Sequence, residues 1–321
     1  MSPRDRSVVP AADFRSYYGR PVVRPPVWRH DIAAYLFTGG LAAGSAMLAA
    51  GGDATGRPAL RRAGRLTALG ALGASTYFLI NDLGRPDRFH HMLRVAKPTS
   101  PMSMGTWILS AFGGAAGVAA AAEIGPAVLS PLGRAGQYGA AALAPALATY
   151  TAVLLADTAT PSWNVAYPEL PLVFAGSALA SGAGVGLLAA PVREAGPARR
   201  MAVLGAALEL YGAHRVETTK GLLSEPYTTG RAGRLLRAGR ALTAAGVLGA
   251  VLGRRSRAVS AASGLSLLAA SLATRFGIFE GGVASAKDPK YTVIPQKERL
   301  LAQRTTTVTP SRGGSSSPIT G

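Results

Sequence analysis

Long charge-free runs separated by short basic clusters set the pattern of this chain. Runs at 32–52, 98–122, 135–156 and 170–192 contain no charged residue. Each reaches or approaches the roughly 20 residues that a helix needs to cross a bilayer. A soluble domain of this length would interrupt such runs with surface charge. The pattern therefore predicts an all-α protein, a polytopic bundle of membrane helices.

The apolar segments predict about eight transmembrane helices within residues 31–282, an arrangement compatible with two four-helix bundles. Residues 1–30 are interpreted as a basic N-terminal arm, and 283–321 as a tail that is disordered after about residue 305 because Ser, Thr and Gly dominate it. The predicted helices are 32–51, 64–82, 103–123, 136–157, 170–190, 198–218, 236–252 and 258–279.

Glycine pairs recur within these segments at helical spacing. Gly40 and Gly44 stand four residues apart, as do Gly182 and Gly186. Small residues at this spacing let membrane helices approach closely. We expect them to serve tight packing within one bundle rather than a specific dimer.

Basic residues exceed acidic ones, with 34 Lys and Arg against 16 Asp and Glu and a net charge of +18. They sit between apolar runs, where loops and lipid headgroups account for them, so nucleic acid is not the expected partner. An even number of helices places both termini on one side. Most Lys and Arg fall on that side, so the positive-inside rule predicts cytoplasmic termini and a multi-pass protein of the plasma (inner) membrane. No cleaved signal peptide is expected, because the first thirty residues lack an apolar core.

Scarce metal ligands limit the cofactors that this chain can hold. It has no cysteine, which excludes a cysteine-ligated iron–sulfur cluster. It has 4 histidines, of which His90 and His91 fall in a predicted loop, so two haems with axial histidines at membrane depth are not expected. No metal site is predicted, and the electrons of a redox reaction would come from a partner.

Ionisable residues gather near one side of the predicted bundle. Asp82 and Asp157 end the second and fourth predicted helices, on the side where His30 begins the first. Glu209 interrupts the sixth apolar segment, and Arg275 lies near the end of the eighth. Ionisable groups at membrane depth are costly and usually face a cavity or a partner side chain.

Structural explanations of the same residues remain open. Asp82 and Asp157 would suit the polar interface, where a basic partner such as Arg85 would offset the unfavourable position of Asp at a helix C-terminus. Arg275 and Glu280 would suit a structural ion pair. The tyrosines near this side would suit packing or an interfacial belt.

Together these groups favour a site for a quinone headgroup. Tyr77 lies five residues before Asp82 and Tyr150 seven before Asp157, which places them about 7 and 10 Å deeper along a helix. Tyr and His donate hydrogen bonds to carbonyl oxygens, and His or carboxylates relay the two protons of reduction. The candidates for proton exchange are Asp82, Asp157, Glu209 and Arg275, and those for quinone contact are His30, Tyr35, Tyr77 and Tyr150.

Four segments carry a family resemblance. They are YLFTGGLAAGSAML from Tyr35, NDLGRPDRFHHMLRVAKPTSPMSMGTW from Asn81, YTAVLLADTATPSW from Tyr150 and TRFGIFEGGVASAKDPKYTVIPQ from Thr274. These resemble the NrfD/PsrC family, the membrane subunits of polysulfide reductase-like and related molybdoenzyme complexes.

The resemblance implies eight helices, no haem, and a menaquinone or ubiquinone site. It implies a ferredoxin-like iron–sulfur subunit that connects to a molybdopterin catalytic subunit. It also places the family's quinone contacts on His30 and Tyr150, its loop aspartate on Asp82 and its late arginine on Arg275.

The sequence therefore predicts a quinone-interacting membrane anchor of a molybdoenzyme-type oxidoreductase complex, which exchanges electrons between the iron–sulfur subunit and the quinone pool. Two alternatives stay open. Glu209, Glu217 and Arg275 would serve as a relay in an ion or solute transporter, although no inverted repeat is visible. A passive membrane anchor without quinone binding is the third interpretation.

Overall fold

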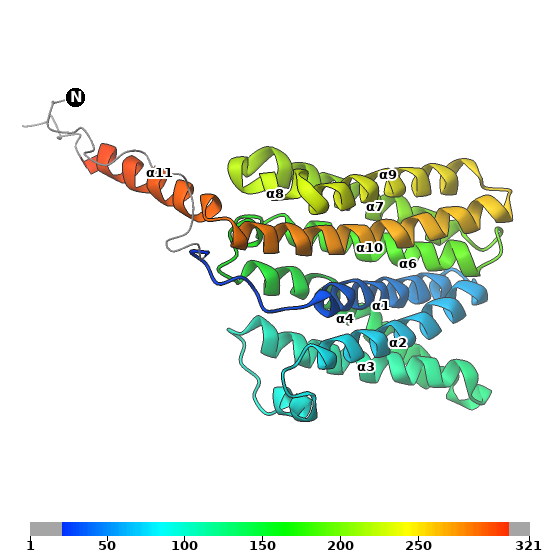
Figure 1. Cartoon of the computed structure of the whole chain (residues 1–321). Coiled ribbons are helices and arrows are strands. Elements are labelled where there is room, and N and C mark those ends of the chain that lie inside the picture. Colours follow the sequence, from blue (N-terminus) through cyan, green and yellow to red (C-terminus); the bar gives the residue numbers. More distant parts are fainter. Residues whose placement is uncertain (1–20, 308–321) are drawn as a thin grey trace, which may run out of the picture.

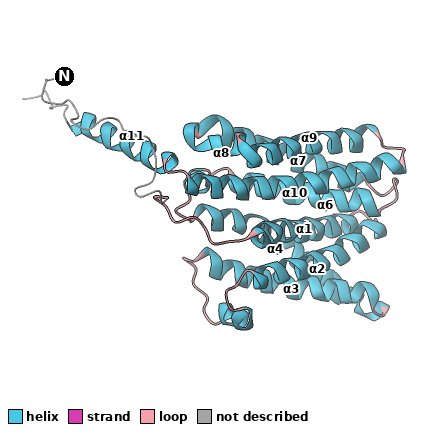
Figure 2. Ribbon diagram, viewed as in Figure 1, coloured by secondary structure: helices cyan, strands magenta, loops and turns pink. Residues whose placement is uncertain are grey.

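The computed structural model describes residues 21–307, and within them every regular element is a helix (Figures 1 and 2). The long helices are α1 (His30–Ala54), α2 (Pro58–Asn81), α3 (Pro101–Ile124), α4 (Ser130–Ala156), α6 (Leu170–Ala189), α7 (Gly196–Thr219), α9 (Gly230–Leu252), α10 (Arg257–Lys287) and α11 (Lys290–Thr307). The short helices are η3 (Pro86–Leu93), η4 (Ala127–Leu129), α5 (Pro161–Val165), η5 (Gly221–Ser224) and α8 (Glu225–Thr228).

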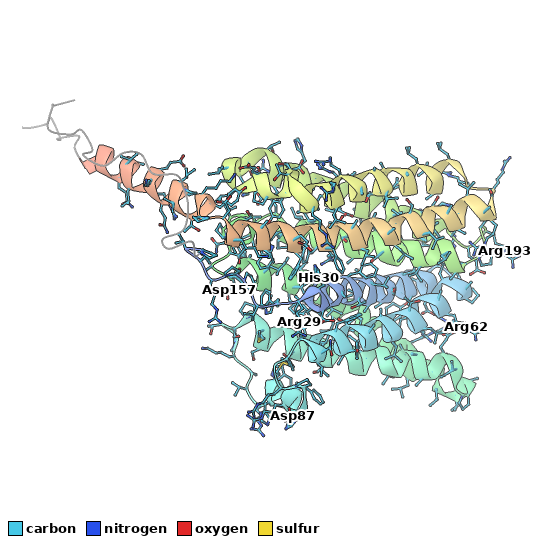
Figure 3. All side chains as sticks on the ribbon, in the orientation of Figure 1. Arg29, His30, Arg62, Asp87, Asp157 and Arg193 are labelled. Carbon is cyan, nitrogen blue, oxygen red and sulfur yellow. The ribbon has the colours of Figure 1, made fainter. Side chains whose placement is uncertain are left out.

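All of the long helices except α11 run side by side in one bundle (Figure 1). Helices α1–α4 pack against one another, as do α6, α7, α9 and α10, and contacts of α1 and α4 with α6 join the two groups. We name the bundle end that holds His30 and Asp157 end A, and the opposite end, with Arg62 and Arg193, end B (Figure 3). Residues 21–29 and α11 both lie at end A, where α11 projects away from the bundle (Figure 1).

Local sequence explains where these helices begin. Proline stands in the first turn of α2, α3, α4, α6 and α7, where its missing N–H costs no helical hydrogen bond. The Ser100 side chain accepts a hydrogen bond from the backbone N–H of Ser103 at the start of α3. Ser256 caps α10 in the same way. Each apolar segment therefore starts at a defined residue.

Six helices within the described residues are long and apolar enough to cross a membrane: α1, α3, Ala127–Ala156 (η4 with α4), α6, α9 and α10. The expected number of about eight is thus not confirmed. The two remaining long helices, α2 and α7, occupy the places of the second and sixth predicted segments. They are less apolar because each has a pair of arginines near its beginning, Arg61 with Arg62 in α2 and Arg199 with Arg200 in α7. In addition, Glu209 interrupts the apolar part of α7.

Small residues bring the helix backbones together inside the bundle. A Cβ built on Gly44 of α1 would overlap the backbone of Ala178 in α6, and one on Gly182 would overlap the backbone of Gly44. Gly184 and Gly264 bring α6 and α10 into the same kind of contact. The glycines therefore serve packing within one chain, which confirms the prediction.

The C-terminal region contains more helix than the sequence suggested. Helix α10 continues to Lys287, and α11 occupies Lys290–Thr307, within the region interpreted as a C-terminal tail. The predicted disorder after about residue 305 falls almost wholly outside the described residues, and so does most of the predicted N-terminal arm.

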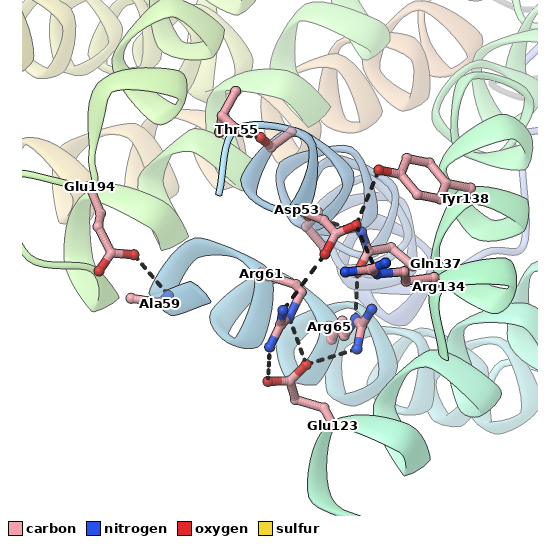
Figure 4. A network of polar contacts seen from close by, with 12 residues as sticks. Asp53, Thr55, Ala59, Arg61, Arg65, Glu123, Arg134, Gln137, Tyr138 and Glu194 are labelled. Carbon is pink, nitrogen blue, oxygen red and sulfur yellow. Dashed lines mark hydrogen bonds and ion pairs between the residues drawn. The ribbon is translucent and has the colours of Figure 1, made fainter. Parts of the chain in front are cut away.

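An ion cluster ties four helices together at end B (Figure 4). Its centre is Glu123 at the end of α3, whose Oε2 accepts hydrogen bonds from Arg65 Nη1 at 2.8 Å and Arg61 Nε at 3.1 Å. The side chains of Arg65 and Glu123 are only 5% and 8% exposed. Arg65 also donates to Gln137 of α4.

The second acid of this cluster is Asp53, at the end of α1. It lies 3.7 Å from Arg61 and 3.8 Å from Arg134, and accepts a 3.2 Å hydrogen bond from the Tyr138 hydroxyl. Every arginine named in the cluster is thus paired with at least one carboxylate, as buried charges require. We interpret the cluster as a structural connection among α1, α2, α3 and α4.

Candidate functional site

A cavity of about 600 Å³ opens at end A between the last turns of α4, the beginning of α3 and the segment around α5. Its lining combines apolar side chains with a few polar ones. The lining residues are Pro98, Thr99, Pro101, Met104, Tyr150, Val153, Ala156, Asp157, Asn164 and Tyr167. Two of the residues predicted from the sequence, Tyr150 and Asp157, therefore share one cavity.

Tyr150 is closely packed at this cavity. It is 8% exposed, and its ring lies directly against Gly105 of α3, where a side chain would overlap it. Its buried hydroxyl has no hydrogen-bond partner. A buried phenol is normally hydrogen-bonded, so this hydroxyl is available as a donor to a bound molecule.

Asp157 follows the last residue of α4 and is exposed at the cavity. Its side chain forms no ion pair with any of the described residues. The carboxylate thus lies seven residues beyond Tyr150 on the same helix, between the cavity and water. This position suits proton exchange with the solvent.

Two further cavities adjoin the first at the chain segment 157–165. One of about 710 Å³ shares Asn164 with it and extends to α11. The other, of about 420 Å³, lies under residues 23–28 and shares Val23 and Ala159 with the 710 Å³ cavity. Open space therefore surrounds the α4–α5 connection at end A.

His30 lies at end A but outside the lining of the Tyr150 cavity. Its Nε2 is 2.7 Å from Glu280 Oε1, and its side chain is 60% exposed. Arg231 approaches the same oxygen at 3.6 Å. Glu280 thus pairs with His30 and Arg231, so the suggested ion pair between Arg275 and Glu280 is wrong.

An aromatic group that the sequence analysis did not single out supports this end. Trp163 of α5 is completely buried and donates a 2.9 Å hydrogen bond to the carbonyl of Ile278. Its ring lies 6.0 Å from that of Trp28 and 5.8 Å from that of Phe279. Gly282 of α10 leaves the space that the indole fills. Trp163 is the last residue of the segment YTAVLLADTATPSW, which carries part of the family resemblance, and this membership could have pointed to it.

Asp82 serves the beginning of α1. Its Oδ1 accepts a 3.1 Å hydrogen bond from the backbone N–H of Arg29, the N-cap of that helix. The carboxylate therefore lies at the positive end of the α1 dipole. Burial raises the pKa of Asp82, while the bond from Arg29 opposes this shift. The partner of Asp82 is thus not Arg85, which was named as an example, but another basic residue, Arg29, which donates through its backbone N–H.

Two predicted tyrosines lie elsewhere. Tyr77 is 63% exposed and its ring contacts Phe78, with the centroids 5.5 Å apart. Tyr35 is 3% exposed within the hydrophobic core. Neither lines the Tyr150 cavity.

Glu209 and Arg275 belong to a separate buried region between α6, α7 and α10. Glu209 is 3% exposed, and its Oε1 accepts a 2.6 Å hydrogen bond from Thr274. Arg275 has no exposure and donates at 2.7 Å to the Phe174 carbonyl, with its guanidinium 3.8 Å from the Phe174 ring centre. A cavity of about 30 Å³ beside Glu209 has room for about one water molecule.

Among the described residues, no group of three or more His, Cys, Asp or Glu side chains is placed to hold a metal ion. The site chemistry at end A thus consists of a free phenol, a solvent-facing carboxylate and a histidine–glutamate pair. These groups can orient a carbonyl compound and exchange protons.

Comparison with known proteins supplies the family. The family model described as polysulphide reductase, NrfD, matches residues 21–210. No curated protein matches the chain. The matched range includes His30, Tyr150 and Asp157, whereas the segment from Thr274 lies beyond it. Because this range covers more than half of the 321 residues, the chain belongs to the polysulphide reductase NrfD family and is a multi-pass membrane subunit of an oxidoreductase complex.

Proposed function

We propose that this protein is the quinone-reactive membrane subunit of a molybdoenzyme-type complex, exchanging electrons between an iron–sulfur partner subunit and menaquinone or ubiquinone. The observation that carries the proposal is the cavity at end A, which is lined by Tyr150, with its unpartnered hydroxyl, and by Asp157. The molybdopterin subunit would carry the chemistry of the second substrate.

The cavity suits a quinone headgroup by size and lining. At about 600 Å³ it falls within the usual 300–1,000 Å³ of small-molecule sites. Met104 and Val153 supply apolar contact, and the Tyr150 hydroxyl would donate to one quinone carbonyl. The isoprenoid tail would leave along α3, whose most apolar stretch is only 28% buried and therefore faces lipid.

Quinone reduction to quinol takes up two electrons and two protons. The electrons would arrive from the iron–sulfur subunit, because this chain holds no cysteine for a cluster of its own. In the proposal that subunit docks at end A, where the cavity opens. Asp157 would pass protons from water to the reduced oxygens, and would accept them when quinol is oxidised. His30 with Glu280 forms a second titratable pair at the same end, outside the cavity lining.

Two of the remaining predicted residues would hold helices in place rather than contact the quinone. Asp82 holds the N-terminus of α1 through Arg29, and Arg275 connects α10 to α6 through Phe174. Eight long helices crossing the plasma membrane, with end A on the cytoplasmic side, are part of the proposal. The many basic residues support that orientation.

Replacing one hydroxyl tests the site. Tyr150→Phe should lower quinone-linked turnover of the intact complex about 100- to 1,000-fold, as expected when a donor to a reacting oxygen is lost. The matched control is Tyr77→Phe, which removes the same atom from an exposed ring and should leave turnover unchanged. Equal turnover in the two variants would overturn the proposal. If wild type also fails to bind quinone, the passive-anchor alternative holds.

A further inference from the structure

The connection between α2 and α3, residues 82–100, lies at the side of the bundle near end A and does not cover that end (Figure 1). It contains η3, in which no residue is buried. Asp87 marks its position below α2 and α3 in the same view (Figure 3). The connection therefore lies next to α3, at the level where α3 begins.

Large apolar side chains are exposed on this connection and on the adjacent start of α3. Phe89 is 43%, Leu93 38% and Val95 64% exposed. On α3, Met102 is 53% and Trp107 42% exposed. Apolar surface in water costs about 25 cal/mol per Å², so a covering medium is expected. Trp at this level is typical of the membrane–water interface.

The same connection is strongly basic. Arg85, Arg88, Arg94 and Lys97 stand on it with Asp87 as the acid within η3. Arg88 lies 4.0 Å from Asp87. Among the described residues, Arg85, Arg94 and Lys97 form no ion pair. The unpaired cations suit the phosphate headgroup of an anionic phospholipid, and the exposed apolar side chains beside them suit its acyl chains.

A groove of about 260 Å³ lies between the connection and α3, lined by Met92, Val95, Lys97, Ser100, Met102, Ser103 and Thr106. Hydrogen bonds fix its wall. The Ser103 hydroxyl donates to the Val95 carbonyl at 2.8 Å and accepts from the Lys97 N–H at 3.0 Å. Trp107 donates to the same carbonyl at 3.3 Å. The groove thus has an ordered apolar lining with a cation at its rim.

We propose that residues 85–97 and the first turns of α3 bind an anionic phospholipid. The phosphodiester would lie against Lys97 and Arg94, and an acyl chain would follow Met92 and Met102. A lipid is favoured over a protein partner because residues 82–100 lie at the flank of the bundle beside α3 (Figure 1), a helix apolar enough to cross a membrane and with only 28% of its apolar stretch buried. This proposal is independent of quinone binding.

Fluorescence quenching in nanodiscs tests the proposal, because Trp107 lies at the groove. Phosphatidylglycerol with brominated acyl chains should quench wild-type protein at lower mole fraction than brominated phosphatidylcholine. Trp107→Phe gives the background from the other two tryptophans. The triple variant Arg88→Gln, Arg94→Gln, Lys97→Gln should need about 100-fold more brominated phosphatidylglycerol, since each of the three basic residues near an anionic surface contributes about fivefold.

The matched control removes three exposed arginines from end B: Arg193→Gln, Arg254→Gln, Arg255→Gln. It should be quenched like wild type. Equal quenching by both lipids in wild type would overturn the proposal, and so would unchanged quenching in the end-A triple variant. If that variant keeps its lipid response but loses the co-purifying partner subunits, the surface is a protein interface and the proposal is wrong.

Discussion

Gly105 of α3 lies directly against the ring of Tyr150 in α4, so that any side chain at position 105 would overlap the phenol. The glycine fixes the ring where it lines the cavity at end A. This contact explains why a residue without a side chain stands near the beginning of α3. It also offers a way to move the phenol without removing it.

Gly105→Ala should lower quinone-linked turnover at least as much as Tyr150→Phe, because the ring must leave its place. Gly117→Ala, in the same helix with nothing within 4 Å of the added carbon, is the control. Turnover of the complexes, normalised to assembled protein, is the measurement. Normal activity in Gly105→Ala would show that the position of Tyr150 is unimportant.

Asp157→Asn should slow quinone turnover while quinone still binds, because the amide keeps the shape of the carboxylate but carries no exchangeable acid. The affinity, measured by displacement of a fluorescent quinone analogue, should stay within about twofold. The expected rate loss is about 10²-fold, the usual contribution of a general acid or base. Loss of binding with an unchanged rate would contradict this assignment.

Asp82 offers a test by pH. Its folded-state pKa is raised by burial, so the folded protein holds this proton more tightly than the unfolded chain. The carboxyl therefore favours the folded state at low pH, and this contribution is lost as pH rises through the folded pKa. Asp82→Asn, which can still accept from Arg29, should be at least as stable as wild type at pH 7. Asp82→Ala should lower the free energy of unfolding by about 1 kcal/mol, because the hydrogen bond from the Arg29 N–H at the start of α1 is lost.

Thermal unfolding in detergent at pH 4 and pH 7 would check both variants. The difference between wild type and Asp82→Asn should shrink at the lower pH. A wild type that is more stable than Asp82→Asn at pH 7 would show that the ionised carboxylate is favourable there.

The ion cluster at end B predicts a large effect on stability. Glu123→Gln leaves the buried guanidinium of Arg65 without its charge partner, which should destabilise the protein by about 3 kcal/mol. The effect on quinone turnover of surviving protein should be small, because the cluster lies at the end opposite the cavity. Glu194→Gln is the control, since this acid accepts only a backbone hydrogen bond from Ala59. Similar melting temperatures for the two variants would contradict this reading.

The sequence predicted the helical segments well because a bilayer leaves an apolar helix as almost the only solution for such runs. Helix α2 shows the limit, since two of the charges that make it less apolar, Arg61 and Arg65, are paired with acids on other helices. Arg65 meets Glu123 of α3 and Gln137 of α4, and no local pattern reveals such pairs.

The sequence predicted how far along the helices the site residues lie, but not which face of each helix they occupy. Asp157 and His30 do lie at one end (Figure 3). Yet Tyr77 is exposed, Tyr35 lies in the core, and Glu209 with Arg275 forms another region. Position along a helix follows from residue number, whereas the face that a residue occupies depends on which neighbours pack there. The cavity is also lined by Pro98 and Tyr167, which lie in connections, and by Asn164 of the short helix α5.

Photolabelling would test the central claim most directly. The intact complex in native membranes is illuminated with an azido-quinone, and labelled peptides of this chain are identified by mass spectrometry. We predict labels on residues 98–105 and 150–167, which excess natural quinone suppresses and Tyr150→Phe weakens. Labels confined to α7, α9 and α10, or labels that excess quinone does not suppress, would contradict the quinone site at Tyr150.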